Sequence, residues 1–449
     1  MAGLLKHKNI DEINNIGILA AIFLIATFFP VGVDIGSKFF LLEIISPVIL
    51  VLMIVSLIYS GKRLLIKTHK IYFAAIFILV IWAIISWFRY PLSGSIGMGS
   101  GEGDVGIKSY LRIATGFCTF FITFWYVYHK QNFNYIAILK ILIAFSLLIG
   151  LVRIVSYFLH FDIPLMYGSF RYNPEASGRY GGTAYRLSGL DLAGYCGAFS
   201  LIALRNTKKA PSGIVFISLL AIFTMYMFIN AGRASTIGYL FALFYYFTMV
   251  EKFDIRKIIA VVALIFVLIG SIQFLPEQMV VGQLSRITAI QGGIQGQYAS
   301  RRGVIFKAFL EEFYKKPIFG RGIRPVSIDQ TNRNTEWIQN QLADGGHGSY
   351  HSILGVFGLG GFFFLAVFLF LPIIQSHFKL NSKYLAYRPI YIFIILNLLS
   401  KSLVFYAGGK GYNDYTLYML TAIFIAISAK KYHIVRLEAT INPESDNQT

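Results

Sequence analysis

The 449-residue chain is 56% hydrophobic and 16% aromatic, and only 14% of its residues are charged, compared with roughly 25% in ordinary soluble domains. Its net charge of +19 does not indicate nucleic-acid binding, because the cations lie in short loops between apolar runs, where Lys and Arg set topology and meet lipid phosphates. The apolar runs are about 17–25 residues long, which is the length needed to cross roughly 30 Å of hydrocarbon. The composition therefore excludes an ordinary soluble domain and predicts an integral membrane protein.

Apolar runs recur along the whole chain and predict an all-α fold with about 12 transmembrane helices. We find no internal repeat and no separate soluble domain, so residues 1–449 are expected to form a single polytopic membrane domain. The predicted spans are 14–32, 39–60, 71–88, 110–128, 135–159, 191–204, 213–230, 235–250, 257–275, 352–374, 389–406 and 414–429.

The loops between these spans predict the orientation of the chain. Every second loop is basic, from Lys6 and Lys8 near the N-terminus to Lys430 and Lys431 after the last span. This alternation stays in register only if both termini are cytoplasmic. The longest loop, 276–351, then lies on the opposite side of the membrane, between helices 9 and 10.

Residues 301–316 within this large loop have helical periodicity. Phe306, Phe309 and Phe313 share one face, while Lys307 and Glu311 lie on the other. An amphipathic helix of this kind can rest on the membrane surface or pack on the fold of the loop itself. Both arrangements are compatible with the sequence.

The loops on the non-cytoplasmic side are rich in arginine, which topology does not require there. Guanidinium groups bind phosphates through two hydrogen bonds and stay charged in a partly dry site. Such loops would suit an anionic ligand at the outer leaflet, although arginines also serve as interfacial and solubilising residues. Arg233 stands out, because it lies in a tight turn between two spans, where a charged residue is expected to be functional. The ten arginines are Arg171, Arg179, Arg186, Arg233, Arg286, Arg301, Arg302, Arg321, Arg324 and Arg333.

The segment GGHGSYHSILGVFGLGG, residues 345–361, leads from the large loop back into the membrane. His347 and His351 are four residues apart and can share a helical face. A zinc site of the His-Glu-x-x-His type would need Glu at position 348, which is Gly348 here, so no metal and no cofactor is expected. A histidine at a membrane interface can act as a general base, or it can be a hydrogen-bonded interfacial residue.

Taken together, these segments resemble the O-antigen ligase and polymerase family, the Wzy/WaaL-type membrane glycosyltransferases. Members show a His-Asn-x-x-Leu-like start and then Gly-Leu-x-Gly eleven to fourteen residues later, opening a span; here His347 is followed by Gly358, Leu359 and Gly361. Gly348 replaces the usual Asn and His351 takes the Leu position, so either histidine could be the one used, and we favour His347.

Upstream segments extend the resemblance, which covers roughly residues 160–375. Gly232-Arg233-Ala234 matches the family's Ser-Arg-Gly turn, and Arg186-Leu187-Ser188-Gly189 resembles its Arg-x-x-Gly element. The family also has an Arg, an Ala seven residues later and then a Pro-hydrophobic-x-Gly-x-Gly stretch. The residues that match this pattern here are Arg301, Ala308, Pro317, Ile318, Gly320 and Gly322.

The resemblance implies transfer of a glycan from undecaprenyl diphosphate to an acceptor hydroxyl at the periplasmic face of the bacterial inner membrane. It implies a metal-independent, inverting reaction without a cofactor, in which arginines stabilise the leaving diphosphate and a histidine receives the acceptor proton. The catalytic candidates are His347, Arg233 and Arg301. The candidates for substrate binding are Arg179, Tyr185, Arg186, Arg302 and His351.

The acceptor is not specified by these motifs. A polymerase would use another lipid-linked repeat unit, whereas a ligase would use lipid A-core; we favour the polymerase because Arg186-Leu187-Ser188-Gly189 is more typical of it. A lipid-linked oligosaccharide flippase or transporter is the alternative from another class. The expected partners are the lipid-linked donor and acceptor, membrane lipids and a chain-length regulator protein, with no nucleic acid.

Overall fold

The computed structural model of the chain describes most of the apolar segments and leaves the longest loops outside the description. At several segment ends only the backbone is described. The described residues are 22–29, 31–34, 38–60, 69–89, 108–130, 133–159, 166–168, 190–207, 209–229, 233–251, 301–323, 349–380, 387–407 and 414–441.

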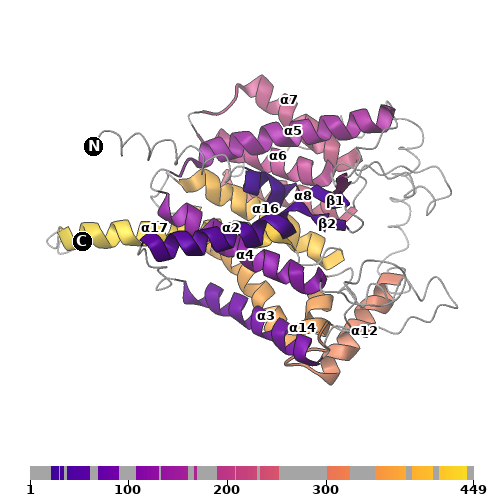
Figure 1. Cartoon of the computed structure of the whole chain (residues 1–449). Coiled ribbons are helices and arrows are strands. Elements are labelled where there is room, and N and C mark those ends of the chain that lie inside the picture. The colour runs from indigo at the N-terminus through magenta and orange to yellow at the C-terminus, as the bar shows by residue number, and fades with distance from the viewer. Residues whose placement is uncertain are drawn as a thin grey trace.

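The described part of the chain is helical apart from three short strands (Figure 1). Two helices continue through single π-helical turns, η2 (Tyr246–Val250) after α8 and η4 (Ala366–Phe370) between α14 and α15. The helices are α2 (Leu41–Ser60), α3 (Lys70–Arg89), α4 (Lys108–His129), α5 (Tyr135–Leu159), α6 (Leu190–Arg205), α7 (Gly213–Ile229), α8 (Arg233–Tyr245), α12 (Arg301–Lys315), α14 (Ser349–Leu365), α15 (Leu371–Leu380), α16 (Arg388–Ala407) and α17 (Tyr415–Ile441).

Five helical segments are long and apolar enough to cross a membrane: Lys70–Arg89, Tyr110–His129, Tyr135–Ser156, Tyr350–Leu380 and Arg388–Tyr406. Shorter apolar helices accompany them, among them Gly213–Ile229 and Tyr415–Lys430. Large apolar side chains also face outward; Phe88 is 83% exposed and Ile214 is 82% exposed. An apolar exterior of this extent is typical of a protein whose solvent is lipid, so the chain is a helical membrane protein.

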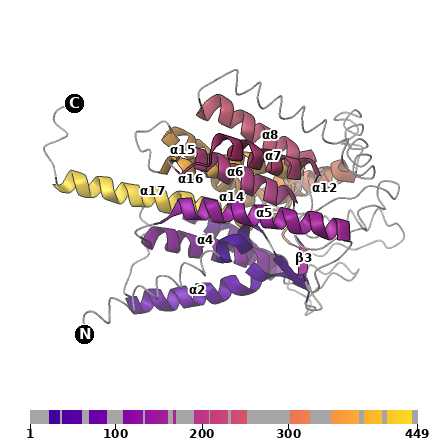
Figure 2. The ribbon, with the colours of Figure 1, turned by 90° about the horizontal axis from the view of Figure 1, so that it is seen from above.

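Most helices run roughly parallel or antiparallel to one another, so their ends gather into two groups (Figures 1 and 2). At one end, which we call the α12 end, α2, α4, α6, α8, α14 and α17 begin. At the opposite end, Lys430 Nζ donates a hydrogen bond to the Lys130 carbonyl (2.5 Å), and Arg388 Nη2 donates one to the Val250 carbonyl (3.2 Å). These contacts join the end of α4 to α17, and the end of η2 to the start of α16.

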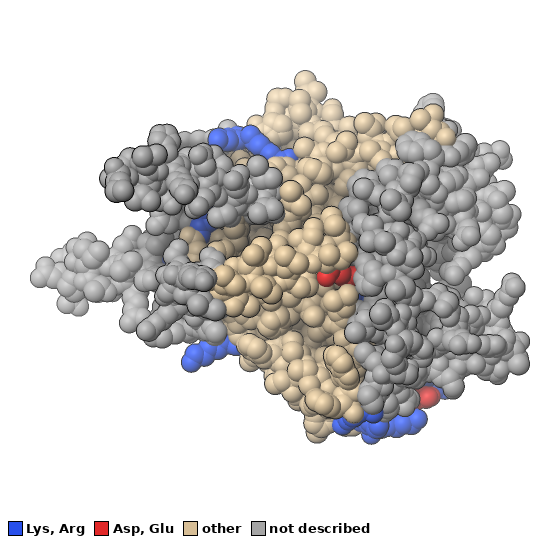
Figure 3. Space-filling model, viewed as in Figure 1, with Lys and Arg blue, Asp and Glu red and all other residues tan. Residues whose placement is uncertain are grey.

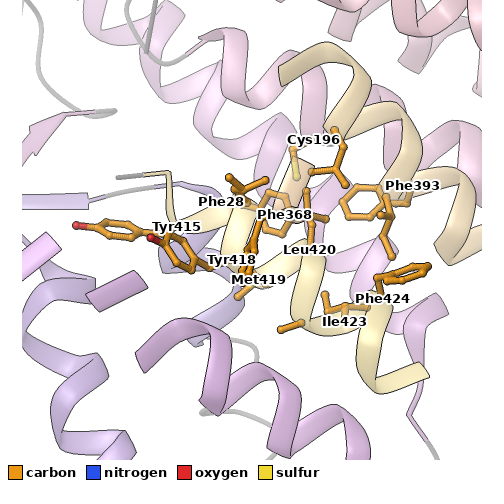
Figure 4. Packing of buried hydrophobic residues seen from close by; sticks show 14 of the residues in the cluster. Phe28, Cys196, Phe368, Phe393, Tyr415, Tyr418, Met419, Leu420, Ile423 and Phe424 are labelled. Atoms are coloured by element: carbon orange, nitrogen blue, oxygen red, sulfur yellow. The ribbon is translucent and has the colours of Figure 1, made fainter. Parts of the chain in front are cut away.

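The core lies around α6, α16 and α17. Twelve of the sixteen residues of α6 are buried, which explains why so short an apolar run is stable: protein rather than lipid surrounds it. Around α17, aromatic rings fill the space between the helices, with Phe368 and Tyr418 at a centroid distance of 5.7 Å (Figure 4). Cys196 lies among these residues as a buried free thiol.

A small antiparallel sheet lies at the α12 end and was not anticipated from the sequence. Strand β1 (Val31–Asp34) pairs with both β2 (Lys38–Phe40) and β3 (Met166–Gly168), in the order β2-β1-β3. It joins the start of α2 to the segment that follows α5. The sheet therefore fixes two connections that the sequence analysis treated as separate loops.

Candidate functional site

The residues predicted from the sequence as site residues are described to different extents. His347, Arg179, Tyr185 and Arg186 lie outside the described residues. Arg233 is the first residue of α8, and Arg301 and Arg302 open α12, but only their backbone positions are described. His351 lies in the first turn of α14, and its side chain is described.

Helix α12 packs along the first half of α14. Its side chains Ile305 and Phe309 are completely buried, and Phe309 contacts α14 where Gly355 leaves room for its ring. One turn earlier, the ring of Phe306 stacks on His351, with 4.4 Å between centroids and 7° between planes. The two helices therefore start at the same end of the molecule, and α12 covers α14 with its apolar face while Lys307 and Glu311 stay exposed.

Helix α14 is broken in its middle, and the segment after α12 fills the break. Gly358 has φ 59° and ψ −149°, which interrupts the helical hydrogen bonds. Backbone polar groups at membrane depth need partners, and residues 317–322 provide them. We call this arrangement the interlock. Its hydrogen bonds run from Arg321 N to Gly355 O (2.8 Å), from Gly322 N to Val356 O (2.9 Å) and from Leu359 N to Pro317 O (2.8 Å).

Two glycines make the interlock possible. Gly320 has φ 62° and Gly358 has φ 59°, which are left-handed values that side chains disfavour. The two backbones also approach closely: a Cβ on Gly358 would lie 2.5 Å from the carbonyl oxygens of Pro317 and Ile318. The two Gly-containing motifs identified in the sequence, 317–322 and 358–361, are therefore two halves of one main-chain contact.

Helix α3 holds the interlock from the side. The indole N–H of Trp82 donates a hydrogen bond to the Ile318 carbonyl (3.0 Å), and its ring stacks on Phe319 (5.0 Å between centroids). Ser86 Oγ accepts a hydrogen bond from the Ile323 backbone N–H (2.6 Å). The segment that connects α12 to the rest of the large loop is thus fastened to a membrane-length helix.

Arg321 lies inside the interlock, and the sequence analysis did not select it as a site residue. Its side chain is buried, at 2% exposure, and its guanidinium lies 5.2 Å from the centroid of Phe309. A guanidinium stays charged even when buried, so it contributes a fixed positive charge between α12 and α14. The flanking glycines of Gly-Arg-Gly were the signal that could have singled it out from the other arginines.

His351 lies in an aromatic slot. Phe306 stacks on one side of the imidazole, and Tyr406 of α16 lies 6.3 Å away by ring centroids. Its Nδ1 is buried and has no hydrogen-bond partner among the described residues. An imidazole nitrogen in this state can accept a proton or a hydrogen bond from a ligand.

A second group of charged residues lies at the start of α17. Glu43 of α2 is buried and accepts hydrogen bonds from Tyr415 OH (2.9 Å) and Arg112 Nε (3.4 Å). Asp414, the residue before Tyr415, forms an ion pair with Lys401 of α16 (2.6 Å). Asp414 and Tyr415, two consecutive residues at the start of α17, therefore connect this helix to α2, α4 and α16.

Asp414 also caps α17. Its Oδ1 accepts hydrogen bonds from the backbone N–H of Thr416 (3.0 Å) and of Leu417 (3.3 Å), as an N-cap carboxylate does.

A small pocket adjoins the Lys401 side chain and has room for about one water molecule. It is lined by Phe28, Leu192, Tyr195, Cys196, Asn397, Ser400, Lys401 and Thr416.

The start of α8, which carries Arg233, is tied to α6. Ser235 Oγ donates a hydrogen bond to Asp191 Oδ2 (3.1 Å), and Tyr195 OH donates one to the Ser235 carbonyl (2.7 Å). Both α6 and α8 begin at the α12 end, so the backbone of Arg233 is held at the same end as the interlock.

Arg153 is a further charged residue that the sequence analysis overlooked. It lies within α5 and is only 1% exposed. A lone arginine inside an apolar run of 25 residues was a clear signal. With Arg153, the buried charged side chains of the described residues are Glu43, Arg153 and Arg321.

The fold and these contacts define a helical membrane protein with a broken, interlocked helix and a layer of charged residues at one end. No family model matches the chain, and no curated protein matches it significantly.

Proposed function

We propose that the chain is a membrane glycosyltransferase of the polysaccharide-polymerase type. In this proposal it transfers a glycan from undecaprenyl diphosphate to a hydroxyl of another lipid-linked repeat unit, at the periplasmic face of the bacterial inner membrane. Transfer inverts the anomeric centre in a single displacement and uses no metal. Twelve spans, with both termini in the cytoplasm, are part of the same proposal.

The observation that carries the proposal is the union of α12 with α14. The interlock and the Phe306–His351 stack bring the first turns of the two helices to the same end of the molecule. The first turn of α12 begins with Arg301 and Arg302, and the first turn of α14 begins two residues after His347. In the proposed reaction, arginines would supply positive charge for the leaving diphosphate, and a histidine would supply the base for the acceptor hydroxyl.

The main chemical requirement of this reaction is stabilisation of the negative charge on the leaving group. The leaving diphosphate gains negative charge in the transition state, and preorganised guanidinium groups lower the barrier by stabilising it. Arg233 and Arg301 are proposed for this role, with Arg179, Arg186 and Arg302 binding the rest of the diphosphate. The buried guanidinium of Arg321 adds a fixed positive charge between α12 and α14.

The acceptor hydroxyl must lose a proton as it attacks, and a histidine suits this step near neutral pH. Glu43 and Asp414 already form ion pairs with Arg112 and Lys401, so these carboxylates are engaged in contacts that hold helices together. We therefore assign the base to His347. His351, whose Nδ1 has no hydrogen-bond partner in the part of the chain that the structure describes, is proposed to orient the acceptor.

The test is complementation of a strain that lacks the gene, with surface polysaccharide separated by gel. For a polymerase, the deletion leaves lipid A-core with a single repeat, and His347→Ala, Arg233→Ala and Arg301→Ala fail to restore the ladder. Lys209→Ala is the matched control, because this exposed lysine lies at the opposite end and should restore the ladder fully.

Other outcomes separate the alternatives. Loss of all attached glycan, with chains accumulating on the lipid carrier, would indicate a ligase. Unchanged banding in the deletion strain would refute both enzymes and favour a flippase or transporter. Full restoration by folded His347→Ala protein would refute the assignment of the base.

A further inference from the structure

The end of α3, the last turn of α12 and the residues that follow α12 form an exposed corner of the molecule, which we call the α3–α12 corner. Its apolar side chains are unusually open: Phe88 is 83%, Tyr314 76% and Ile318 56% exposed. Exposed cations lie among them, namely Arg89 on α3 and Lys315 and Lys316 at the end of α12. Figure 3 shows basic side chains gathered at this lower edge of the molecule.

The corner is held together by specific contacts. Trp82 of α3 donates its hydrogen bond to the Ile318 carbonyl and stacks on Phe319. Phe319 also forms a cation–π contact, because the Arg89 guanidinium lies 5.2 Å from the centroid of its ring. Arg89 and the turn after Lys316 are therefore fixed relative to each other, and a ligand that needs both does not have to assemble them.

The position along the membrane normal points to lipid. Helix α3 is one of the membrane-length helices and ends at Arg89, so this cation lies at the level of the headgroups. Towards the bilayer centre, α3 exposes Ile84 (47%) and Ile81 (48%). Cations at headgroup depth above an exposed apolar strip match the layout of a phospholipid.

We propose that the α3–α12 corner binds an anionic phospholipid. Its phosphate lies between Arg89, Lys315 and Lys316, and an acyl chain runs along the exposed face of α3. The carboxylates of Glu311 and Glu312 lie one turn before Lys315 and Lys316, so the three cations exceed the two carboxylates by one charge. A zwitterionic headgroup carries its own cation and gains less from this field, which makes the site selective for anionic lipid.

Lipid binding at the corner can be measured through quenching of the fluorescence of Trp82. A variant that keeps Trp82 and replaces Trp87, Trp125 and Trp337 by Phe is reconstituted in phosphatidylcholine vesicles. Its fluorescence is then quenched with brominated phosphatidylglycerol or, at the same mole fraction, brominated phosphatidylcholine. We expect the anionic lipid to occupy the site about five- to tenfold more readily, given the attraction of each basic residue near the surface for anionic lipid.

Substitutions test which groups hold the phosphate. Arg89→Gln/Lys315→Gln/Lys316→Gln should reduce the preference to about one, whereas Arg89→Lys/Lys315→Arg/Lys316→Arg should keep it. Lys307→Gln is the matched control, because Lys307 is exposed on the same helix but about 12 Å from Lys315, and it should also keep the preference.

Three results would overturn the proposal: no preference in the parent protein, an unchanged preference in the triple Gln variant, or loss of preference in Lys307→Gln. Displacement of the quencher by a trace of polyprenyl phosphate, but not by excess unbrominated phosphatidylglycerol, would assign the corner to a carrier lipid instead. None of these readouts depends on glycosyl transfer, so the proposal can fail or hold independently of the proposed function.

Discussion

Gly358→Ala tests the interlock most directly. At φ 59° and ψ −149° the backbone lies close to a region essentially reserved for glycine, where another residue costs about 1–3 kcal/mol. The new Cβ would also lie 2.5 Å from the Pro317 and Ile318 carbonyl oxygens, so the 317–322 segment would have to withdraw. Withdrawal breaks the three main-chain hydrogen bonds of the interlock, each worth about 1 kcal/mol net. We expect a total loss of about 5 kcal/mol.

The assay is unfolding of purified protein in mixed micelles by increasing SDS, followed by fluorescence. Gly213→Ala is the matched control: a Cβ there meets no atom within 4 Å, and Ala favours a helix over Gly by up to about 1 kcal/mol. Gly320→Ala should resemble Gly358→Ala, and the double variant should lose much less than the two single losses combined, because both substitutions break the same contact.

Two results would refute this reasoning. If Gly358→Ala unfolded within about 0.5 kcal/mol of the parent protein, the break in α14 would not depend on glycine. If the losses of Gly320→Ala and Gly358→Ala were additive, the two segments would not form one structural unit.

Two further predictions concern other charged groups. Lys401→Met should lower the free energy of unfolding by about 2–3 kcal/mol, because it leaves the Asp414 carboxylate without its cation; Lys401→Met/Asp414→Asn should recover most of the loss in the same SDS titration, and failure to recover would show that the ion pair is not the cause. Burial, with the nearby Lys379 cation as a second cause, lowers the pKa of His69 from 6.5 to about 4. Because the folded pKa lies below the unfolded one, stability is complete above pH 6.5 and falls as the pH decreases towards 4, by at most about 2 kcal/mol after allowance for partial exposure. His69→Asn, which tolerates the positive φ of 67°, should reduce this loss between pH 7.5 and pH 5, and an equal loss in both proteins would assign it to other groups.

Hydropathy predicted the position of most apolar helices, because chain that lies within a bilayer must be both apolar and helical. Ten of the expected spans coincide with described helices, from α2 (Leu41–Ser60) to α17 (Tyr415–Ile441). The span at 257–275 and most of that at 14–32 lie outside the described residues. The sheet of β1, β2 and β3 could not be predicted in this way, because strands of three or four residues have no measurable period.

The candidate site shows the same division between local and long-range information. The apolar period of 301–316 predicts a helix with an apolar face, but it cannot say that α14 is what this face covers. The glycines at 320 and 358 were recognised as parts of sequence motifs. Glycine is needed at these positions because the two segments, 38 positions apart, come into close main-chain contact. Sequence spacing reports conformation within a segment, and the interlock is a property of two segments.

The distribution of buried charge constrains the kind of function more strongly than the overall charge of the chain does. Among the residues whose burial is described, the buried charged side chains are Glu43, Arg153 and Arg321, and all lie in the half of the molecule at the α12 end. Arg153 is six residues from the end of α5, whose first residue, Tyr135, contacts Tyr387 at the opposite end. Transporters place their ionisable groups near the middle of the membrane, between repeated halves. Buried charges confined to one half suit chemistry at one leaflet, and this supports the proposed transferase over the transporter alternative.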